Sequence, residues 1–161
     1  MDILEFAMQM EKDGEKYYRE LAGKCGAKGL ETIFTMLADS EVAHYNTLKE
    51  MAGKMDAQPV DTKILGGVKN VFVQMKEDGD TFDFNDSQLD NYRKAQEIEK
   101  KAEAFYLEKA GAVETEAQKN IFKSLAIEER QHVQVLGSII DFVSKPDSWL
   151  ENAEWHHLNE Y

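Results

Sequence analysis

The amino-acid sequence predicts an all-α fold: a four-helix bundle with a long crossover between its second and third helices and a short helical tail at the C-terminus. Three observations predict it. Four long segments repeat their apolar residues with the period of an α-helix. The 161 residues include only two prolines, Pro59 and Pro146, so long helices can form without interruption. The two halves of the chain also match at a fixed offset of 88 residues, which indicates two similar helix pairs.

The first helix pair is expected at about 2–23 and 29–51. Each segment has one apolar stripe and ends at a glycine, a residue that commonly terminates helices. A short gap joins the two segments, so we expect them to lie antiparallel. The stripes contain Leu4, Ala7, Met8, Tyr18, Leu21 and Ala22 in the first segment, and Leu30, Ile33, Phe34, Leu37, Leu48 and Met51 in the second.

The second helix pair is expected to begin at Asp86 or Ser87, either of which would be a good N-cap. Its first helix runs to about Ala110 and its second from about Glu114 to Val143, because Pro146 prevents much extension. The stripes contain Tyr92, Ala95, Ala102 and Tyr106, and then Ile121, Phe122, Leu125, Leu136, Ile139, Ile140 and Val143.

The connection between the pairs, residues 54–85, is long enough to reach the far end of a bundle. Its part 62–76 is expected as a short helix or an extended segment, and 77–80 as a turn. We expect residues 1–145 to form the bundle and 146–161 an amphipathic tail that packs on the bundle or on a partner chain. The tail carries Trp149, Leu150, Trp155 and Leu158, and His156 and His157 are expected at its surface.

Composition excludes several classes of function. The net charge of −12 argues against binding to nucleic acid or to an anionic membrane, both of which attract basic surfaces. Cys25 is the only cysteine, so neither an internal disulfide nor a four-cysteine metal site is expected. No secretory signal is recognisable at the N-terminus, and no apolar stretch is long enough to span a bilayer. We therefore expect a cytoplasmic protein.

The repeat places carboxylates and imidazoles on the apolar stripes. Its polar pairs are Glu11 with Glu99, Glu41 with Glu129, and His44 with His132, and Tyr18 matches Tyr106. Each glutamate lies four or seven residues from apolar members of its stripe, and each histidine lies four residues before a leucine. Burial of unpaired carboxylates costs several kcal/mol or more, so four carboxylates at one level require shared positive charge.

Two metal ions would supply that charge. Each Glu-x-x-His, at 41–44 and at 129–132, places one carboxylate and one imidazole on one helix face, one turn apart. Two such pairs with two single glutamates form the ligand pattern of di-iron carboxylate bundles. We therefore predict Glu11, Glu41, His44, Glu99, Glu129 and His132 as metal ligands. A carboxylate and imidazole set without thiolate suits two iron ions, with manganese or a mixed pair as the alternative.

Several side chains have two interpretations. Tyr18 and Tyr106 are either core aromatics or hydrogen-bond partners that tune the site, and we take them as candidate catalytic residues. Glu15 and Glu103 lie one turn beyond predicted ligands. Each has three interpretations: an additional metal ligand, a hydrogen-bond acceptor beside the site, or a solvated charge.

These residues resemble the rubrerythrin branch of the ferritin-like superfamily. The resemblance rests on EKDGEKYY at 11–18, EVAH at 41–44, EKKAEAFY at 99–106 and ERQH at 129–132, and it covers nearly the whole chain. It implies a ferritin-like bundle that forms a homodimer. It also implies that Glu41 and Glu129 bridge two metals, that Glu11 and Glu99 are terminal ligands, and that each histidine completes one metal.

The resemblance further implies a di-iron oxidoreductase that reduces hydrogen peroxide or dioxygen in oxidative stress defence. Typical members carry a four-cysteine rubredoxin domain, which a chain with one cysteine cannot form, so an external donor such as a rubredoxin is expected to supply electrons. Typical members also place a redox-exchanging glutamate three residues after the ligand that corresponds to Glu99, where this chain has Ala102. Both differences favour a second hypothesis, a non-enzymatic iron-handling protein; the third is a metal-free scaffold.

Overall fold

The computed structural model describes residues 2–151 and 158, and within these residues it contains six helices and no strand. The helices are α1 (Ile3–Lys24), α2 (Lys28–Ala52), α3 (Ile64–Asp78), α4 (Asp86–Lys109), α5 (Glu116–Ser144) and α6 (Pro146–Glu151). The all-α prediction is confirmed, and the four long segments coincide with α1, α2, α4 and α5 to within about two residues at each end.

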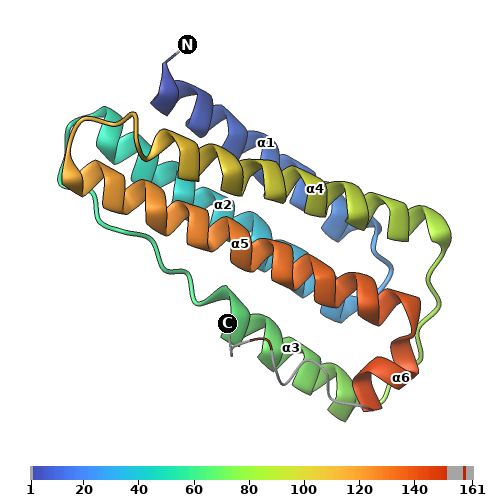
Figure 1. The fold of residues 1–161 in the computed structure, drawn as a ribbon. Coiled ribbons are helices and arrows are strands. Elements are labelled where there is room, and N and C mark those ends of the chain that lie inside the picture. Colours follow the sequence, from blue (N-terminus) through green and yellow to red (C-terminus); the bar gives the residue numbers. More distant parts are fainter. Residues whose placement is uncertain (1, 152–157, 159–161) are drawn as a thin grey trace.

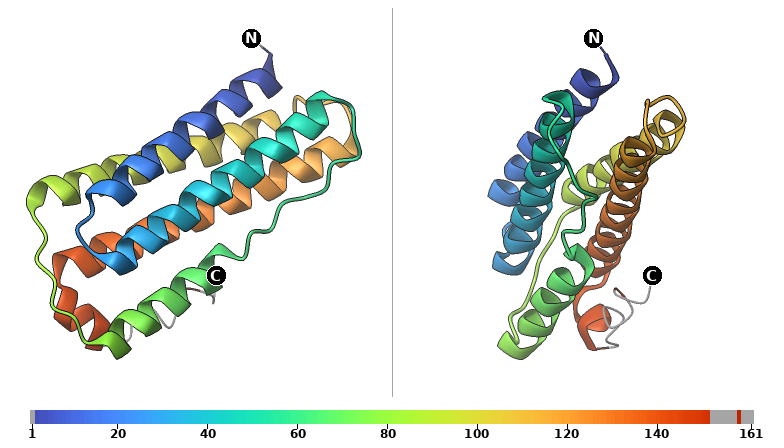
Figure 2. Two further views of the ribbon diagram at one scale, coloured as in Figure 1. Left: turned by 180° about the vertical axis from the view of Figure 1, so that it is seen from behind. Right: turned by 90° about the vertical axis from the view of Figure 1, so that its left-hand side faces the viewer.

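The four long helices form an elongated bundle in two antiparallel pairs, α1 with α2 and α4 with α5 (Figures 1 and 2). The turns within the pairs lie at opposite ends of the bundle. Residues 53–85 leave the end of α2, run along the outside of the bundle and reach the start of α4 at the other end. Helix α3 lies in this connection and packs against α2 and α5.

Side-chain caps define where three of the long helices begin. Asp2 accepts a hydrogen bond from the amide of Glu5 at 2.8 Å at the start of α1. Helices α4 and α5 begin with capping boxes, Asn85 with Gln88 and Thr115 with Gln118. The predicted N-cap of α4, Asp86 or Ser87, is therefore wrong by one or two residues, because the reciprocal bonds between Asn85 and Gln88 fix an earlier start.

The connection between the pairs is more helical than its sequence indicated. The segment predicted as either helix or extended chain forms α3, which continues through Asp78. Gly79 then ends the helix in the left-handed region, with φ of 68° and its amide bonded to the carbonyl of Met75. The turn predicted at 77–80 consequently begins two residues later, after Asp78.

The hydrophobic core consists of two clusters separated by a polar layer. One cluster is built around Phe34, Leu37, Phe72 and Leu136, and the other around Leu48, Phe122 and Leu125. Along each long helix, the six predicted ligands occupy the positions between the two clusters. The bundle thus surrounds a layer of buried charge near its middle with apolar packing on both sides.

The described part of the tail packs on the molecule itself. Trp149 of α6 is buried, and its ring centroid lies 4.4 Å from that of Phe72 in α3 and 6.0 Å from that of Phe142 in α5. Leu150 and Leu158 are also buried. The predictions for Trp155, His156 and His157 concern residues that lie outside the described part of the chain.

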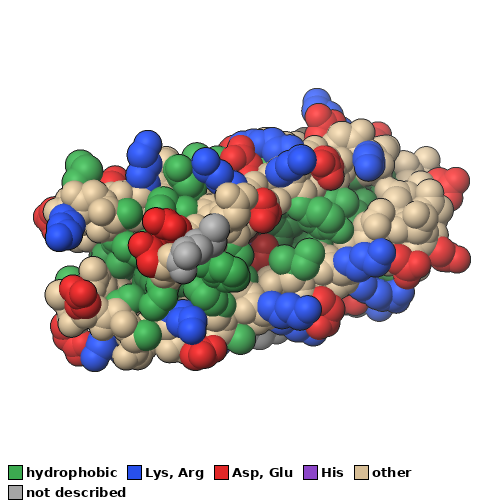
Figure 3. Space-filling model, turned by 90° about the horizontal axis from the view of Figure 1, so that it is seen from above, with side chains coloured by type: hydrophobic (Ala, Val, Ile, Leu, Met, Phe, Trp, Pro, Cys, Tyr) green, Lys and Arg blue, Asp and Glu red, His purple; other side chains and the backbone are tan. Residues whose placement is uncertain are grey.

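One face of the molecule carries an apolar band. On the side of α1 and α4, hydrophobic side chains gather between rows of charged residues (Figure 3). Phe6 of α1 and Phe105 of α4 contact each other, with ring centroids 5.1 Å apart, and Phe6 is half exposed. Among the described residues, no helix has both the length and the hydrophobicity needed to cross a membrane.

Candidate metal centre

The structure brings the six predicted ligands together in the polar layer. Each of the four long helices contributes at its middle: α1 gives Glu11, α2 gives Glu41 and His44, α4 gives Glu99, and α5 gives Glu129 and His132. All six side chains are buried, and the two histidines are fully so. The spacing of four and seven residues from apolar neighbours places them on inward faces, because such neighbours share one side of a helix.

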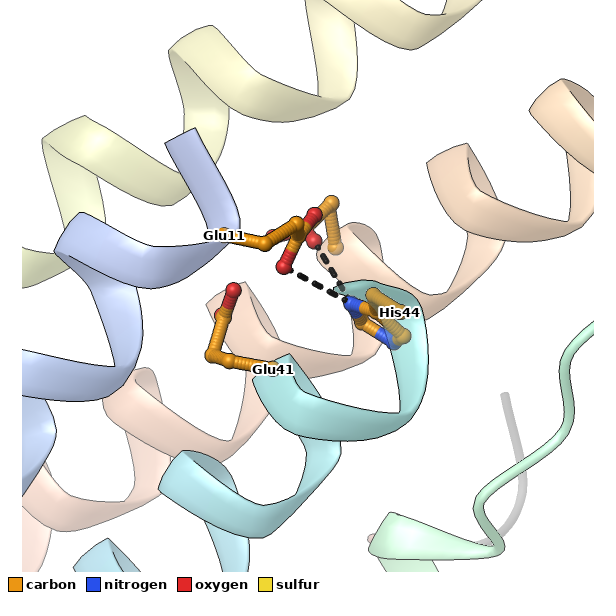
Figure 4. Close-up of side chains that lie close together, drawn as sticks. Glu11, Glu41 and His44 are labelled. Carbon is orange, nitrogen blue, oxygen red and sulfur yellow. Dashed lines mark hydrogen bonds and ion pairs between the residues drawn. The ribbon is translucent and has the colours of Figure 1, made fainter. Parts of the chain in front are cut away.

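These side chains form two groups of four that share two members. Glu11 and His44 belong to one group and Glu99 and His132 to the other, while Glu41 and Glu129 belong to both. Within each group, one ligand atom per residue lies within 4.8 Å of all the others. Figure 4 shows Glu11, Glu41 and His44 with their polar ends directed toward one another between the helices. Each group could hold a metal ion, and the two groups have two carboxylates in common.

The two tyrosines make crossed hydrogen bonds. The hydroxyl of Tyr18 donates to Glu99 Oε1 at 2.7 Å, and that of Tyr106 donates to Glu11 Oε1 at 2.6 Å. Each tyrosine therefore supports the glutamate of the other half of the chain. Burial and the nearby carboxylates raise the pKa of both phenols well above the ordinary value, so both hydroxyls remain donors at neutral pH.

Several buried atoms in the layer have no hydrogen-bond partner among the described residues. They are Glu41 Oε1, Glu99 Oε2, Glu129 Oε1 and His132 Nδ1. Buried polar atoms are almost always paired in folded proteins, so each exception requires an explanation. All four belong to one group of candidate ligands, and a cation would satisfy them together. The residues present therefore fit a metal centre.

The carboxylates of the layer differ in how strongly they hold protons. Burial raises the pKa of Glu41 and of Glu129 well above the ordinary value, and the neighbouring carboxylates raise it further. Burial acts in the same direction on Glu99, but hydrogen bonds and the charge of His132 outweigh it and lower the pKa to about 2. These shifts favour the protonated form of the two shared carboxyls and the ionised form of Glu99.

On the other half of the layer, burial would raise the pKa of Glu11 and lower that of His44. The two groups face each other with His44 Nδ1 3.2 Å from Glu11 Oε2, and their mutual attraction reverses both effects. The pKa of Glu11 is lowered, and that of His44 is raised well above its ordinary value. His44 Nδ1 points at the carboxylates, so this nitrogen is the one available to a metal once its proton leaves.

Comparison with known protein families shows to which family the chain belongs. The family model described as Rubrerythrin matches residues 2–140. The chain belongs to the rubrerythrin family. The ferritin-like bundle of rubrerythrins agrees with the helical fold of this chain, and the resemblance drawn from the motifs is confirmed. Searches of the curated proteins and of the solved structures found no significant match.

In this rubrerythrin, the two glutamates one turn beyond the ligands do not belong to either group. Glu15 forms an ion pair with Arg19 at 2.9 Å, and Glu103 forms one with Arg130 at 2.9 Å. Their partners direct both carboxylates toward the surface. Ala102, the position of the redox-exchanging glutamate in typical rubrerythrins, is buried and offers no ligand atom.

One buried glutamate next to the layer was not predicted from the sequence. Glu128 is 1% exposed, and its Oε1 lies 2.9 Å from His44 Nε2. Burial would raise the pKa of Glu128, but the hydrogen bond and charge of His44 lower it, so this carboxylate is ionised. A sequence signal was present, because Glu128 lies seven residues after Ile121 and seven before Val135, both on the buried face of α5.

Proposed function

We propose that this rubrerythrin is a di-iron oxidoreductase that reduces hydrogen peroxide, or dioxygen, with electrons from an external one-electron carrier such as a rubredoxin. The observation that carries the proposal is the pair of buried four-residue groups that share Glu41 and Glu129. In a rubrerythrin-family chain, this ligand set suits iron better than zinc, because it contains carboxylates and imidazoles but no thiolate.

The proposed reaction converts one hydrogen peroxide, two electrons and two protons to two water molecules. A bound iron pair would supply one electron from each ion and a template for the oxidant. The external carrier then returns two electrons, one at a time, and the cycle closes without any other reductant. Reduction of dioxygen to water would require four electrons and four protons, and therefore two such returns.

The side chains of this chain have separate tasks in the proposal. Glu41 and Glu129, which belong to both groups, would contribute to both metal positions, and Glu11 and Glu99 would each contribute to one. The hydroxyls of Tyr18 and Tyr106 fix the orientation of the terminal glutamates, because each donates a short hydrogen bond to one carboxylate oxygen. The apolar clusters above and below the layer exclude water, which strengthens these electrostatic contacts.

The shared carboxylates also couple metal binding to protons. Burial and mutual repulsion favour the protonated forms of Glu41 and Glu129, and each must lose its proton to act as a ligand. Metal affinity should therefore rise with pH, and binding should release protons into a weakly buffered solution.

The test is the rate at which hydrogen peroxide oxidises the anaerobic protein loaded with two ferrous ions, followed by stopped-flow absorbance. We expect oxidation faster than that of free ferrous iron under the same conditions, and loss of the excess rate in Glu129→Ala, which removes one shared carboxylate. A wild-type rate no greater than that of free ferrous iron would exclude peroxide reduction.

A second candidate function is iron handling without redox turnover. Ala102 favours it, since this position cannot supply the carboxylate that exchanges with histidine in typical rubrerythrins. This alternative predicts rapid exchange of bound iron with a chelator and no catalytic consumption of peroxide when reduced rubredoxin is present. Steady-state turnover with that donor separates the two candidates.

A further inference from the structure

The two histidines of the metal centre have unlike partners on their outer nitrogens. His44 Nε2 lies 2.9 Å from the carboxylate of Glu128 and 3.3 Å from the hydroxyl of Ser40, whereas His132 Nε2 lies 2.8 Å from that hydroxyl and contacts no carboxylate among the described residues. Ser40 and Glu128 occupy equivalent positions in the 88-residue repeat. The six candidate ligands repeat between the two halves, whereas this pair does not, so it gives the two metal positions different chemistry.

Glu128 is itself held from outside the bundle. The hydroxyl of Thr62 donates to Glu128 Oε1 at 2.7 Å, and the amide of Thr62 donates to Oε2 at 3.4 Å. Thr62 lies in the connection between α2 and α4, just before α3. The carboxylate therefore has fixed donors on both oxygens, and the remaining acceptor capacity of Oε1 is directed at His44. A buried carboxylate with this set of partners is oriented rather than mobile.

The geometry sets the tautomer of His44. Both oxygens of Glu128 already accept hydrogen bonds from Thr62, so Oε1 is also the acceptor toward His44, and the proton of the imidazole stays on Nε2. Nδ1, which faces Glu11 and Glu129 at 3.2 Å, is then free to give its lone pair to a cation. A carboxylate in this position also makes the imidazole a stronger ligand. His132 has only the neutral hydroxyl of Ser40, which is a weaker acceptor.

We propose that Glu128 positions His44 as a ligand and makes the metal position that contains His44 the tighter of the two. This inference rests on the proposed metal centre but does not require any particular reaction. Filling is consequently ordered: the first ion occupies the position of Glu11 and His44, and the second occupies that of Glu99 and His132.

The experiment is a titration of the metal-free protein with Co²⁺, followed by calorimetry and visible absorption at one pH. The wild-type protein is compared with Glu128→Gln, which keeps the shape of the side chain and removes its charge. Glu103→Gln is the matched control, because it removes the same charge from a glutamate that pairs with Arg130 outside the site. Both glutamine variants are then repeated in His44→Ala and His132→Ala backgrounds.

We expect two Co²⁺ ions to bind wild-type protein in steps of unequal affinity, and Glu128→Gln to weaken the tighter step by about 10-fold or more. The loss should persist in His132→Ala and fall to no more than about twofold in His44→Ala, because the effect passes through His44. Glu103→Gln should change neither step by more than about twofold.

Equal steps in the wild-type protein, or the same loss from Glu128→Gln with and without His44, would overturn the inference while leaving the metal centre intact. Absence of any Co²⁺ binding to the wild-type protein would overturn the metal centre and the inference together. If Glu128→Gln does not fold, Thr62→Val takes its place, since it removes the 2.7 Å hydrogen bond to Glu128 from a partly exposed residue. It must weaken the same step, again only when His44 is present.

Discussion

Gly14 provides a direct test of how closely the metal centre is packed against the helices. It lies in the middle of α1, where a glycine costs about 1 kcal/mol of helix stability relative to alanine. A methyl group at this position would lie 2.9 Å from Glu41 Oε2 and 3.0 Å from Glu41 Cδ. To restore an ordinary contact of about 3.4 Å, the shared carboxylate would have to move by about 0.5 Å.

Gly14→Ala should therefore separate stability from metal binding. Ligand distances at well-formed metal sites vary by only about 0.2 Å, so a shift of this size should weaken binding by about 10-fold or more, equivalent to about 1.4 kcal/mol. The helix gains up to about 1 kcal/mol, and the Tm of the metal-free protein should rise by no more than about 4 °C.

The matched control is Gly23→Ala in the same helix. An added methyl group at Gly23 has no atom within 4 Å, and this residue is exposed. The control should gain a similar or smaller stability and keep the metal affinity of the wild-type protein. Thermal unfolding by circular dichroism and calorimetric titration with Co²⁺ measure the two quantities. The reasoning is refuted if Gly14→Ala binds Co²⁺ as tightly as Gly23→Ala.

Four further predictions follow from the geometry. Tyr18→Phe and Tyr106→Phe each leave one buried glutamate without its donor, and each should lower the free energy of unfolding of the metal-free protein by about 1–3 kcal/mol in urea. The folded-state pKa values of Glu41 and Glu129 are raised, so the stability they contribute is complete below their unfolded value of 4.5 and is lost as pH rises. Urea titrations from pH 5 to 8 should therefore show wild-type stability falling relative to that of the Glu41→Gln, Glu129→Gln double variant, and parallel curves would contradict this assignment. Ferrous iron at about 100 times its Kd should stabilise the protein by about 2.7 kcal/mol per site, an increase that a chelator removes and that Glu129→Ala should lack. Trp149→Ala should cost about 3–5 kcal/mol, because the ring packs against two phenylalanines, and a change below 1 kcal/mol in urea unfolding would contradict its role as an anchor.

The long helices were predictable because their apolar stripes are continuous and their ends are marked by glycine and by short polar gaps. The less accurate boundaries lie where side chains compete for the same backbone donors. Asn85, Asp86 and Ser87 are all suitable caps, and only the reciprocal bond with Gln88 selects the first. The segment that forms α3 has no such strong pattern, and its helix is stabilised by packing of Phe72 on α5 and α6.

The candidate site was predictable to the extent that the repeat marks it. Pairing of positions 88 residues apart identifies side chains that occur twice, and all six candidate ligands do. Glu128 was missed for the same reason, because its counterpart in the first half is Ser40. Its burial depends on contacts with His44 and Thr62, which come from two other parts of the chain. Sequence symmetry therefore finds what the halves share and overlooks what distinguishes them.

The crossed hydrogen bonds of the two tyrosines mean that the bundle can be assembled from two helix hairpins but that neither hairpin is complete alone. Since Tyr18 serves Glu99 and Tyr106 serves Glu11, neither helix hairpin contains a complete set of partners. Two copies of one hairpin, however, would together contain four glutamates, two histidines and two tyrosines in the same relation. The single chain is in this respect a covalently joined dimer of hairpins, and fragments cut between α2 and α4 should regain the crossed bonds only by associating with each other.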